Sequence, residues 1–158
     1  MPVIEGARCL DLFAGSGANG IEALSRGAAH AVFVEREAAL ARLLSGNLVR
    51  LHVAEHATVA HDDALAWLRQ PATPFDVVFL DPPFAQAETL APDAAQRLET
   101  GGWLAPGACV YMELPAGMQP VLPANWKAHR QVRAGALDAT LYRREAPGVL
   151  SAPQTPTL

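Results

Sequence analysis

Residues 10–20 read LDLFAGSGANG, and our prediction of the fold begins here. It follows an apolar run and precedes a helical pattern, which predicts a strand, a tight turn and the start of a helix. Gly15, Gly17 and Gly20 fit the G-x-G-x-x-G spacing, which lets a ligand approach the backbone at a helix N-terminus. The segment therefore predicts a strand–turn–helix unit with a ligand site at the turn.

Outward from this turn, apolar runs typical of buried strands alternate with amphipathic helical patterns. Such alternation indicates βαβ units and a parallel sheet. Strands are predicted over residues 7–13, 31–35, 57–60, 75–80 and 107–114. Helices are predicted up to Arg26, then over 37–51, 63–69 and 88–99, with the last broken near Pro92. Residues 127–133 and 136–143 are expected to pair antiparallel around a turn at Gly135. The helix over 37–51 is expected to present one leucine face: Leu40, Leu43, Leu44, Leu48 and Leu51.

The bulk composition favours one globular domain, which we place at residues 1–146. The chain has 158 residues, of which 51% are hydrophobic and 18% charged. Residues 147–158 contain three prolines and no charge, so this tail is predicted to be disordered. The start of the chain lacks a signal-peptide pattern, and no apolar run reaches the roughly 18 residues that a membrane span needs. A cytoplasmic protein is expected.

The two cysteines and the charge distribution bear on ligands. Cys9 and Cys109 each lie in a strand-like run, and we interpret them as small core residues. The histidines and cysteines show no metal-ligand spacing, so no metal is expected. The net charge of −4 argues mildly against nucleic acid. Residues 126–144, however, hold one acid, Asp138, and five basic residues, a local charge of +4 that allows a basic face: Lys127, Arg130, Arg133, Arg143 and Arg144.

The glycine turn fits two cofactors. Glu35 lies twenty residues after Gly15, at the end of the second predicted strand, and its carboxylate suits the two ribose hydroxyls of either cofactor. A nicotinamide dinucleotide would explain the glycines and Glu35, but it would not explain Asp11. Asp11, four positions before Gly15, separates the two hypotheses, because a carboxylate there is unfavourable beside a pyrophosphate. It suits the ammonium and sulfonium of S-adenosylmethionine, which is therefore the favoured cofactor.

Neighbouring positions are expected to contact the same cofactor. Phe13 and Ala14 precede the first glycine, and Arg36 follows Glu35. Asp63, with Ala64 next to it, follows the third predicted strand, and its carboxylate suits the adenine amino group. An alternative of nearly equal weight is that Asp63 is the N-cap of the helix that begins there.

Residues 77–84 read VVFLDPPF and end the fourth predicted strand at the edge where open α/β sheets place their sites. Pro82 and Pro83 fix the backbone and remove two donors, so that the carbonyls remain as acceptors. An exocyclic base amine is a poor nucleophile. The Asp81 carboxylate and the Pro82 carbonyl can hold its two hydrogens and orient its lone pair, while Phe84 can stack on the base. These four residues are the predicted catalytic group.

These segments together resemble a known family, the bacterial 16S ribosomal RNA guanine-N2 methyltransferases of the RsmD type, over residues 2–148. The resemblance rests on LDLFAGSGANGIEALSRGA, FVERE, HDDALAWL, VVFLDPPF and the closing PANWKAHRQVRAG…LYRRE. It implies a doubly wound, mostly parallel seven-stranded sheet of the class I, Rossmann-like type with helices on both faces. It also implies S-adenosylmethionine as cofactor and a guanine of small-subunit RNA, in a ribosomal particle, as substrate.

The resemblance assigns roles to individual positions. Asp11, Gly15 and Gly17 would lie at the methionine end of the cofactor, Glu35 at the ribose and Asp63 at the adenine. Residues 81–84 would hold the base. Members of the family usually begin with a further basic segment and a helix, which are expected to contribute to RNA contact.

Two departures bear on the substrate. Asn19 stands where a larger apolar residue is commoner, and residues 85–87 lack the arginines often found there. Alternative substrates are another RNA or a DNA adenine. Alternative functions are a nicotinamide-dependent oxidoreductase and a non-catalytic RNA-binding module. A monomer is expected.

Overall fold

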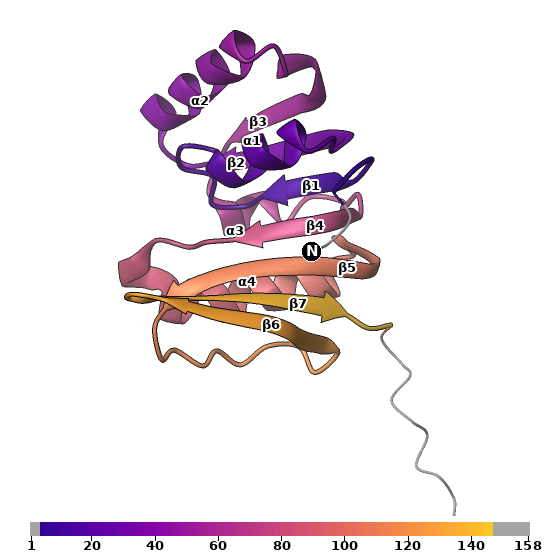
Figure 1. Ribbon diagram of the computed structural model, residues 1–158, viewed down its shortest axis with the longest axis vertical. Helices are drawn as coiled ribbons and strands as arrows, with labels where there is room; N and C mark the ends of the chain where they lie inside the picture. The colour runs from indigo at the N-terminus through magenta and orange to yellow at the C-terminus, as the bar shows by residue number, and fades with distance from the viewer. Residues whose placement is uncertain (1–3, 147–158) are drawn as a thin grey trace, which may run out of the picture.

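In the computed structural model, which describes residues 4–146, a single seven-stranded sheet runs through the molecule in the order β3-β2-β1-β4-β5-β7-β6 (Figure 1). β1 to β5 are parallel, and β7 runs antiparallel between β5 and β6. The mostly parallel sheet and the antiparallel pair are therefore confirmed, while the predicted tail lies outside the described residues. The strands are β1 (Arg8–Asp11), β2 (His30–Glu35), β3 (Ala57–His61), β4 (Phe75–Leu80), β5 (Leu104–Pro115), β6 (Trp126–Ala134) and β7 (Leu137–Arg144).

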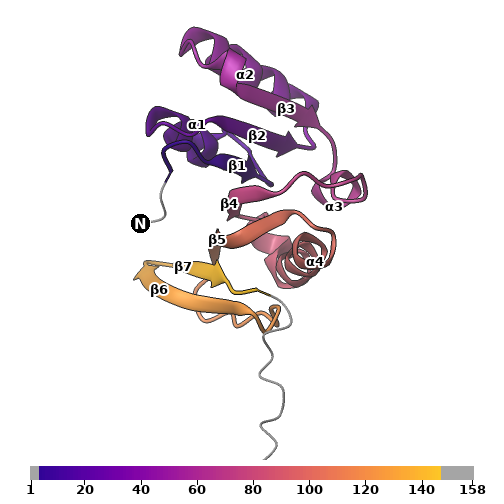
Figure 2. The same ribbon diagram turned by 90° about the vertical axis from the view of Figure 1, so that its right-hand side faces the viewer.

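The helices cover the sheet from both sides, as predicted (Figure 2). α1 and α2 pack on one face over β1, β2 and β3, and α3 and α4 lie on the other. No helix among the described residues is long and apolar enough to cross a bilayer. The helical segments are α1 (Ala18–Ser25), α2 (Ala38–Arg50), α3 (Ala64–Trp67), α4 (Ala87–Thr100) and the short 3₁₀ turns η1 (Ala54–His56) and η2 (Phe84–Gln86).

Strand alternation divides the core into two clusters. Cys9 and Phe33 face α1 and α2, whereas Leu10 and Val78 face α3 and α4. All four residues are fully buried. Because the central strands are covered on both faces, they are apolar at successive positions, which is the pattern that marked them in the sequence. Cys9 is a core residue as predicted, and Cys109 is only partly buried.

Two helical details differ from expectation. α4 runs without a break through Pro92, although that residue cannot donate to the Glu88 carbonyl one turn earlier. A buried alanine row on both sides of the proline, which includes Ala91 and Ala94, holds the helix against the sheet. The expected leucine face of α2 was also wrong in part. The buried residues are Ala41, Leu44 and Leu48, whereas Leu40, Leu43 and Leu51 are 37%, 56% and 53% exposed.

Candidate active site

A cavity of about 580 Å³ opens at the carboxyl edge of the sheet, where β1, β2 and β4 end. The turn after β1 and the diproline segment after β4 both line it, although they are far apart in the chain. The structure therefore brings the two predicted motifs to one place. The predicted residues that line the cavity are Phe13, Ala14, Gly15, Glu35, Arg36, Asp63, Ala64, Asp81, Pro82, Pro83 and Phe84.

The three glycines of the turn have different tasks. Gly15 lines the cavity with a φ of 56°, and a Cβ at this position would meet nothing within 4 Å. A Cβ on Gly17 would overlap the Leu44 side chain of α2, and one on Gly20 would overlap the Phe33 ring of β2. Gly17 and Gly20 thus allow close packing behind the turn, and only Gly15 presents its backbone to the cavity.

The Glu35 carboxylate is held by two backbone donors. The Gly15 N–H donates to its Oε1 at 3.0 Å, and the Glu37 N–H donates to its Oε2 at 2.9 Å. The residue is 9% exposed and lines the cavity. Both oxygens keep further lone pairs, so the carboxylate is fixed in orientation and can still accept from a ligand's hydroxyl groups.

Asp11 lies behind the turn and not on the cavity wall. It is 1% exposed, and its Oδ2 accepts from the Gly20 N–H at 3.1 Å, which ties the end of β1 to the start of α1. Burial raises the pKa of Asp11 to about 7; the Gly20 hydrogen bond lowers it, and the charges of Asp81 and Glu35 add to the increase. Asp11 is therefore not among the residues that line the cavity, and its predicted effect on the choice of cofactor would act through its charge and through its hydrogen bond to Gly20.

Asp63 is the N-cap of α3, the alternative that the sequence left open. Its Oδ2 accepts from the Ala66 N–H at 3.1 Å. Asp62 also lines the cavity, where its Oδ1 accepts from the Asp63 N–H at 2.8 Å and its own N–H donates to the Glu35 carbonyl at 3.1 Å. Asp62 was not predicted to line the cavity, although the two consecutive acids after β3 pointed to this position. An adenine contact from either acid stays a prediction.

The segment after β4 forms the opposite wall. Pro82 is buried, while Asp81 and Phe84 stand at the rim, with Phe84 59% exposed. Leu80 pairs with Met112 of β5, so Glu113 follows at the same level as Asp81. Partial burial, and then the charge of Glu113, raise the pKa of Asp81 to about 6. The rim thus offers a carboxylate that is mostly ionised at neutral pH, next to an exposed aromatic ring.

The other lining residues were not predicted. Four of them adjoin predicted positions in the chain: Leu12, Ser16, Val34 and Glu37. The other three, Leu40, Gln86 and Leu90, reach the cavity from α2, η2 and α4, and their side chains gave no signal in the sequence. Among the residues that the structure describes, no three His, Cys, Asp or Glu side chains are grouped so that they could hold a metal ion.

The seven-stranded order with its antiparallel hairpin, and a cleft between an acidic residue at the end of β2 and a diproline after β4, define a Rossmann-like methyltransferase of class I. Residues 1–143 match the family model described as Conserved hypothetical protein 95. The chain belongs to this family.

Similar proteins described as methyltransferases agree with this class. The chain is 46% identical over 149 residues to Ribosomal RNA small subunit methyltransferase D of Escherichia coli strain K12, an alignment that covers 93% of this chain and 73% of the relative. It is 40% identical to the protein of the same name from Haemophilus influenzae, with 90% and 75% covered. The solved structure "Putative methyltransferase yhhF from Escherichia coli" has a TM-score of 0.86 at 45% identity and covers 91% of this chain and 80% of its own.

Proposed function

We propose that this protein transfers the methyl group of S-adenosylmethionine to the exocyclic N2 amine of a guanine in 16S ribosomal RNA. The observation that carries the proposal is the single cavity lined by Gly15, Glu35 and residues 81–84. The rRNA substrate is supported by the two relatives named as small-subunit methyltransferases. The domain responsible is residues 1–146, and we propose that it acts as a monomer in the cytoplasm, where ribosomal particles assemble.

The cofactor half of the cavity fits S-adenosylmethionine by the chemistry of its donors and acceptors. Glu35, fixed by two N–H groups, would accept from both ribose hydroxyls. Open space at Gly15 lets the backbone approach the methionine part, next to Phe13 and Ala14. Arg36 and Ala64 would border the nucleoside, and Asp63 or Asp62 would accept from the adenine amine. When bound, the cofactor supplies a methyl carbon made electrophilic by the adjoining sulfonium.

The substrate half prepares the amine. The Asp81 carboxylate and the Pro82 carbonyl would each accept one amine hydrogen, which turns the nitrogen lone pair toward the cofactor side of the cavity. Pro83 keeps this backbone rigid, since its φ is −51° and the residue has no N–H. Phe84 would stack on a base that has left its helix. Only a planar base with an exposed amine would satisfy all three contacts.

Asp81 would also receive the proton that the amine loses after methylation. Its pKa of about 6 leaves it mainly ionised at pH 7, and it is a stronger base there than an ordinary aspartate. Asp11 would act from behind the turn by orienting Gly20 and α1, and its field would favour the positive end of the cofactor over a pyrophosphate.

The test uses radiolabelled S-adenosylmethionine and small ribosomal subunits assembled from transcribed, unmodified 16S rRNA. Wild-type protein is expected to label the RNA, and nuclease digestion is expected to give N2-methylguanosine. Asp81→Asn should bind S-adenosylhomocysteine with wild-type affinity and label at least about a hundredfold more slowly, as general bases typically contribute 10²–10⁴-fold. Asp93→Asn, which removes an exposed carboxylate of α4, serves as the matched control. Label found only in DNA adenine, or an Asp81→Asn variant of full activity, would refute the assignment.

A further inference from the structure

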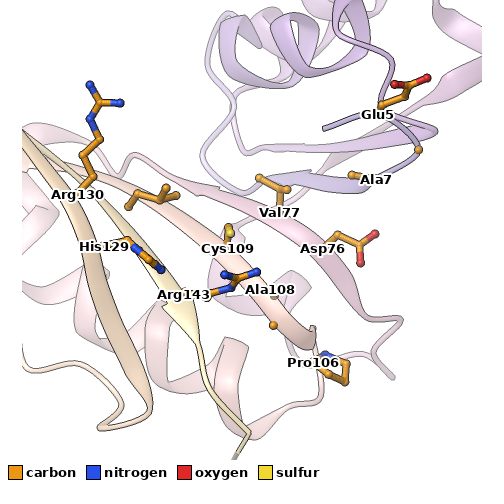
Figure 3. Close-up of a pocket in the computed structure, with 13 residues that line it drawn as sticks. Glu5, Ala7, Asp76, Val77, Pro106, Ala108, Cys109, His129, Arg130 and Arg143 are labelled. Carbon is orange, nitrogen blue, oxygen red and sulfur yellow. The ribbon is translucent and has the colours of Figure 1, made fainter. Parts of the chain in front are cut away.

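One part of the sheet has no helix over it. On the side that carries α1 and α2, those helices contact β1, β2 and β3, and no described helix packs over β5, β7 and β6 (Figure 2). A second cavity of about 530 Å³ lies on this side (Figure 3), and it shares no lining residue with the proposed active site. His129 and Arg143 point into it, and Arg130 stands on its β6 rim. We call the surface formed by Cys109, Tyr111, Lys127, His129, Arg130, Leu141 and Arg143 the open face.

The basic residues of the β6–β7 hairpin lie on both faces of the sheet. Arg133 donates to Asp138 at 2.8 Å, and Arg144 donates to Glu99 of α4 at 2.8 Å, so both of these cations are neutralised on the side of α4. The other three lie on the open face and are all exposed: Lys127, Arg130 and Arg143. None of these three comes within 4.0 Å of an acidic oxygen among the residues that the structure describes.

The three cations stand close together. Lys127 pairs directly with Arg143 across β6 and β7, and Arg130 pairs with Leu141, two residues along β7. Like charges placed opposite each other on neighbouring strands destabilise the pair. The acids at the cavity, Glu5 and Asp76, lie on its far wall, where Asp76 Oδ2 accepts from the Arg8 N–H at 2.9 Å. An external anion would relieve the repulsion.

We propose that the open face binds the phosphate backbone of the RNA strand that carries the target base, through Lys127, Arg130 and Arg143. This inference rests on the proposed function for the identity of the RNA. An RNA backbone presents a row of negative charges, and it complements three uncompensated cations on a protein whose net charge is −4. Such contacts fix the position of the strand, while the Asp81 rim selects the base.

The distance suits one RNA strand that reaches both places. Arg143 pairs with Cys109, which pairs with Val77, four residues before Asp81. With a rise of about 3.3 Å per residue and about 4.8 Å between strands, the Arg143 and Asp81 backbones lie roughly 16 Å apart. A few nucleotides span this distance, so a strand whose base enters the cleft can follow the sheet to the hairpin.

The salt dependence of RNA binding tests the proposal. The triple variant Lys127→Gln, Arg130→Gln, Arg143→Gln is compared with wild type for binding to unmodified small subunits between about 50 mM and 200 mM salt. The slope of log K against log salt should fall in magnitude by about 2 to 3, because each phosphate contact contributes about 0.7–0.9. The matched control Arg42→Gln, Arg50→Gln, Arg69→Gln removes three exposed cations from α2 and from the turn after α3, and it should keep the wild-type slope. Far-UV circular dichroism and urea denaturation check that each variant is folded, independently of any cofactor.

Two results would overturn the proposal. One is a triple variant whose salt-dependence slope equals that of wild type, or a control variant whose slope is reduced as much as that of the triple variant. The other is a wild-type dimer in sedimentation that becomes monomeric in the triple variant, which would make the open face a protein interface. Binding is measured without methyl transfer. A protein that fails to label the subunits would therefore refute the proposed function, while the salt dependence of RNA binding could still be interpreted.

Discussion

Replacing the buried Asp11 with asparagine should stabilise the protein at neutral and higher pH. The carboxyl is 1% exposed and has one hydrogen-bond donor, the Gly20 N–H, which the amide oxygen of asparagine can still accept. Burial, assisted by the charges of Asp81 and Glu35, raises the pKa of Asp11 from 3.8 to about 7. In the unfolded chain the carboxyl has its ordinary pKa, so folding takes up a proton between these two values.

The sign and the size follow from that difference. Because the folded state binds more protons than the unfolded state, this group makes the free energy of unfolding fall as the pH rises from about 4 to about 7. The full loss above pH 7 is on the order of 4 kcal/mol, at about 1.4 kcal/mol per pH unit. Asp11→Asn removes this contribution, so its advantage over wild type should be absent near pH 4 and should grow toward pH 7.

Urea denaturation of wild type and Asp11→Asn at several pH values between about 4 and 8 measures the difference directly. Asp93→Asn, at an exposed position of α4, should run parallel to wild type throughout. A stability–pH curve for Asp11→Asn that is parallel to wild type, or an Asp11→Asn variant that is less stable than wild type at pH 8, would show that the pKa of Asp11 is not raised by burial.

Three further predictions concern the proposed site. The rate of methyl transfer should fall about tenfold between pH 7 and pH 5, since Asp81, with a pKa of about 6, must be ionised. Glu113→Gln should shift this loss of rate to lower pH. A rate–pH profile that does not shift in this variant would contradict the effect of the Glu113 charge on Asp81. Glu35→Gln should weaken S-adenosylhomocysteine binding by about 1–3 kcal/mol in calorimetry, with Glu55→Gln unchanged as the control. Phe84→Ala should lower turnover and leave cofactor affinity near wild type, because the ring stands at the rim; a large loss of affinity would place Phe84 against the cofactor instead.

The sequence predicted much of this architecture because the relevant signals are local. The run from Val77 to Leu80 is apolar because Val77 and Val78, on opposite faces of the sheet, are both buried, and the predicted bounds of β4, 75–80, agree with the structure. The glycine pattern located the turn after β1, since a positive φ at Gly15 and Gly17 restricts these positions almost to glycine. Proline, by contrast, misled the prediction at Pro92, where packing of α4 on the sheet outweighs one missing hydrogen bond.

Local signals were enough to predict the order of the elements, the turn at residues 15–17 and the rigid diproline after β4, because backbone propensity and periodicity depend on neighbouring residues. Three outcomes required the folded chain. Asp11 lies behind the turn, Gly17 and Gly20 accommodate Leu44 and Phe33, and two of the hairpin's arginines are neutralised by acids. Those outcomes depend on which elements face one another across the sheet. Strand alternation assigns each side chain to a face, but what covers that face comes from distant parts of the chain.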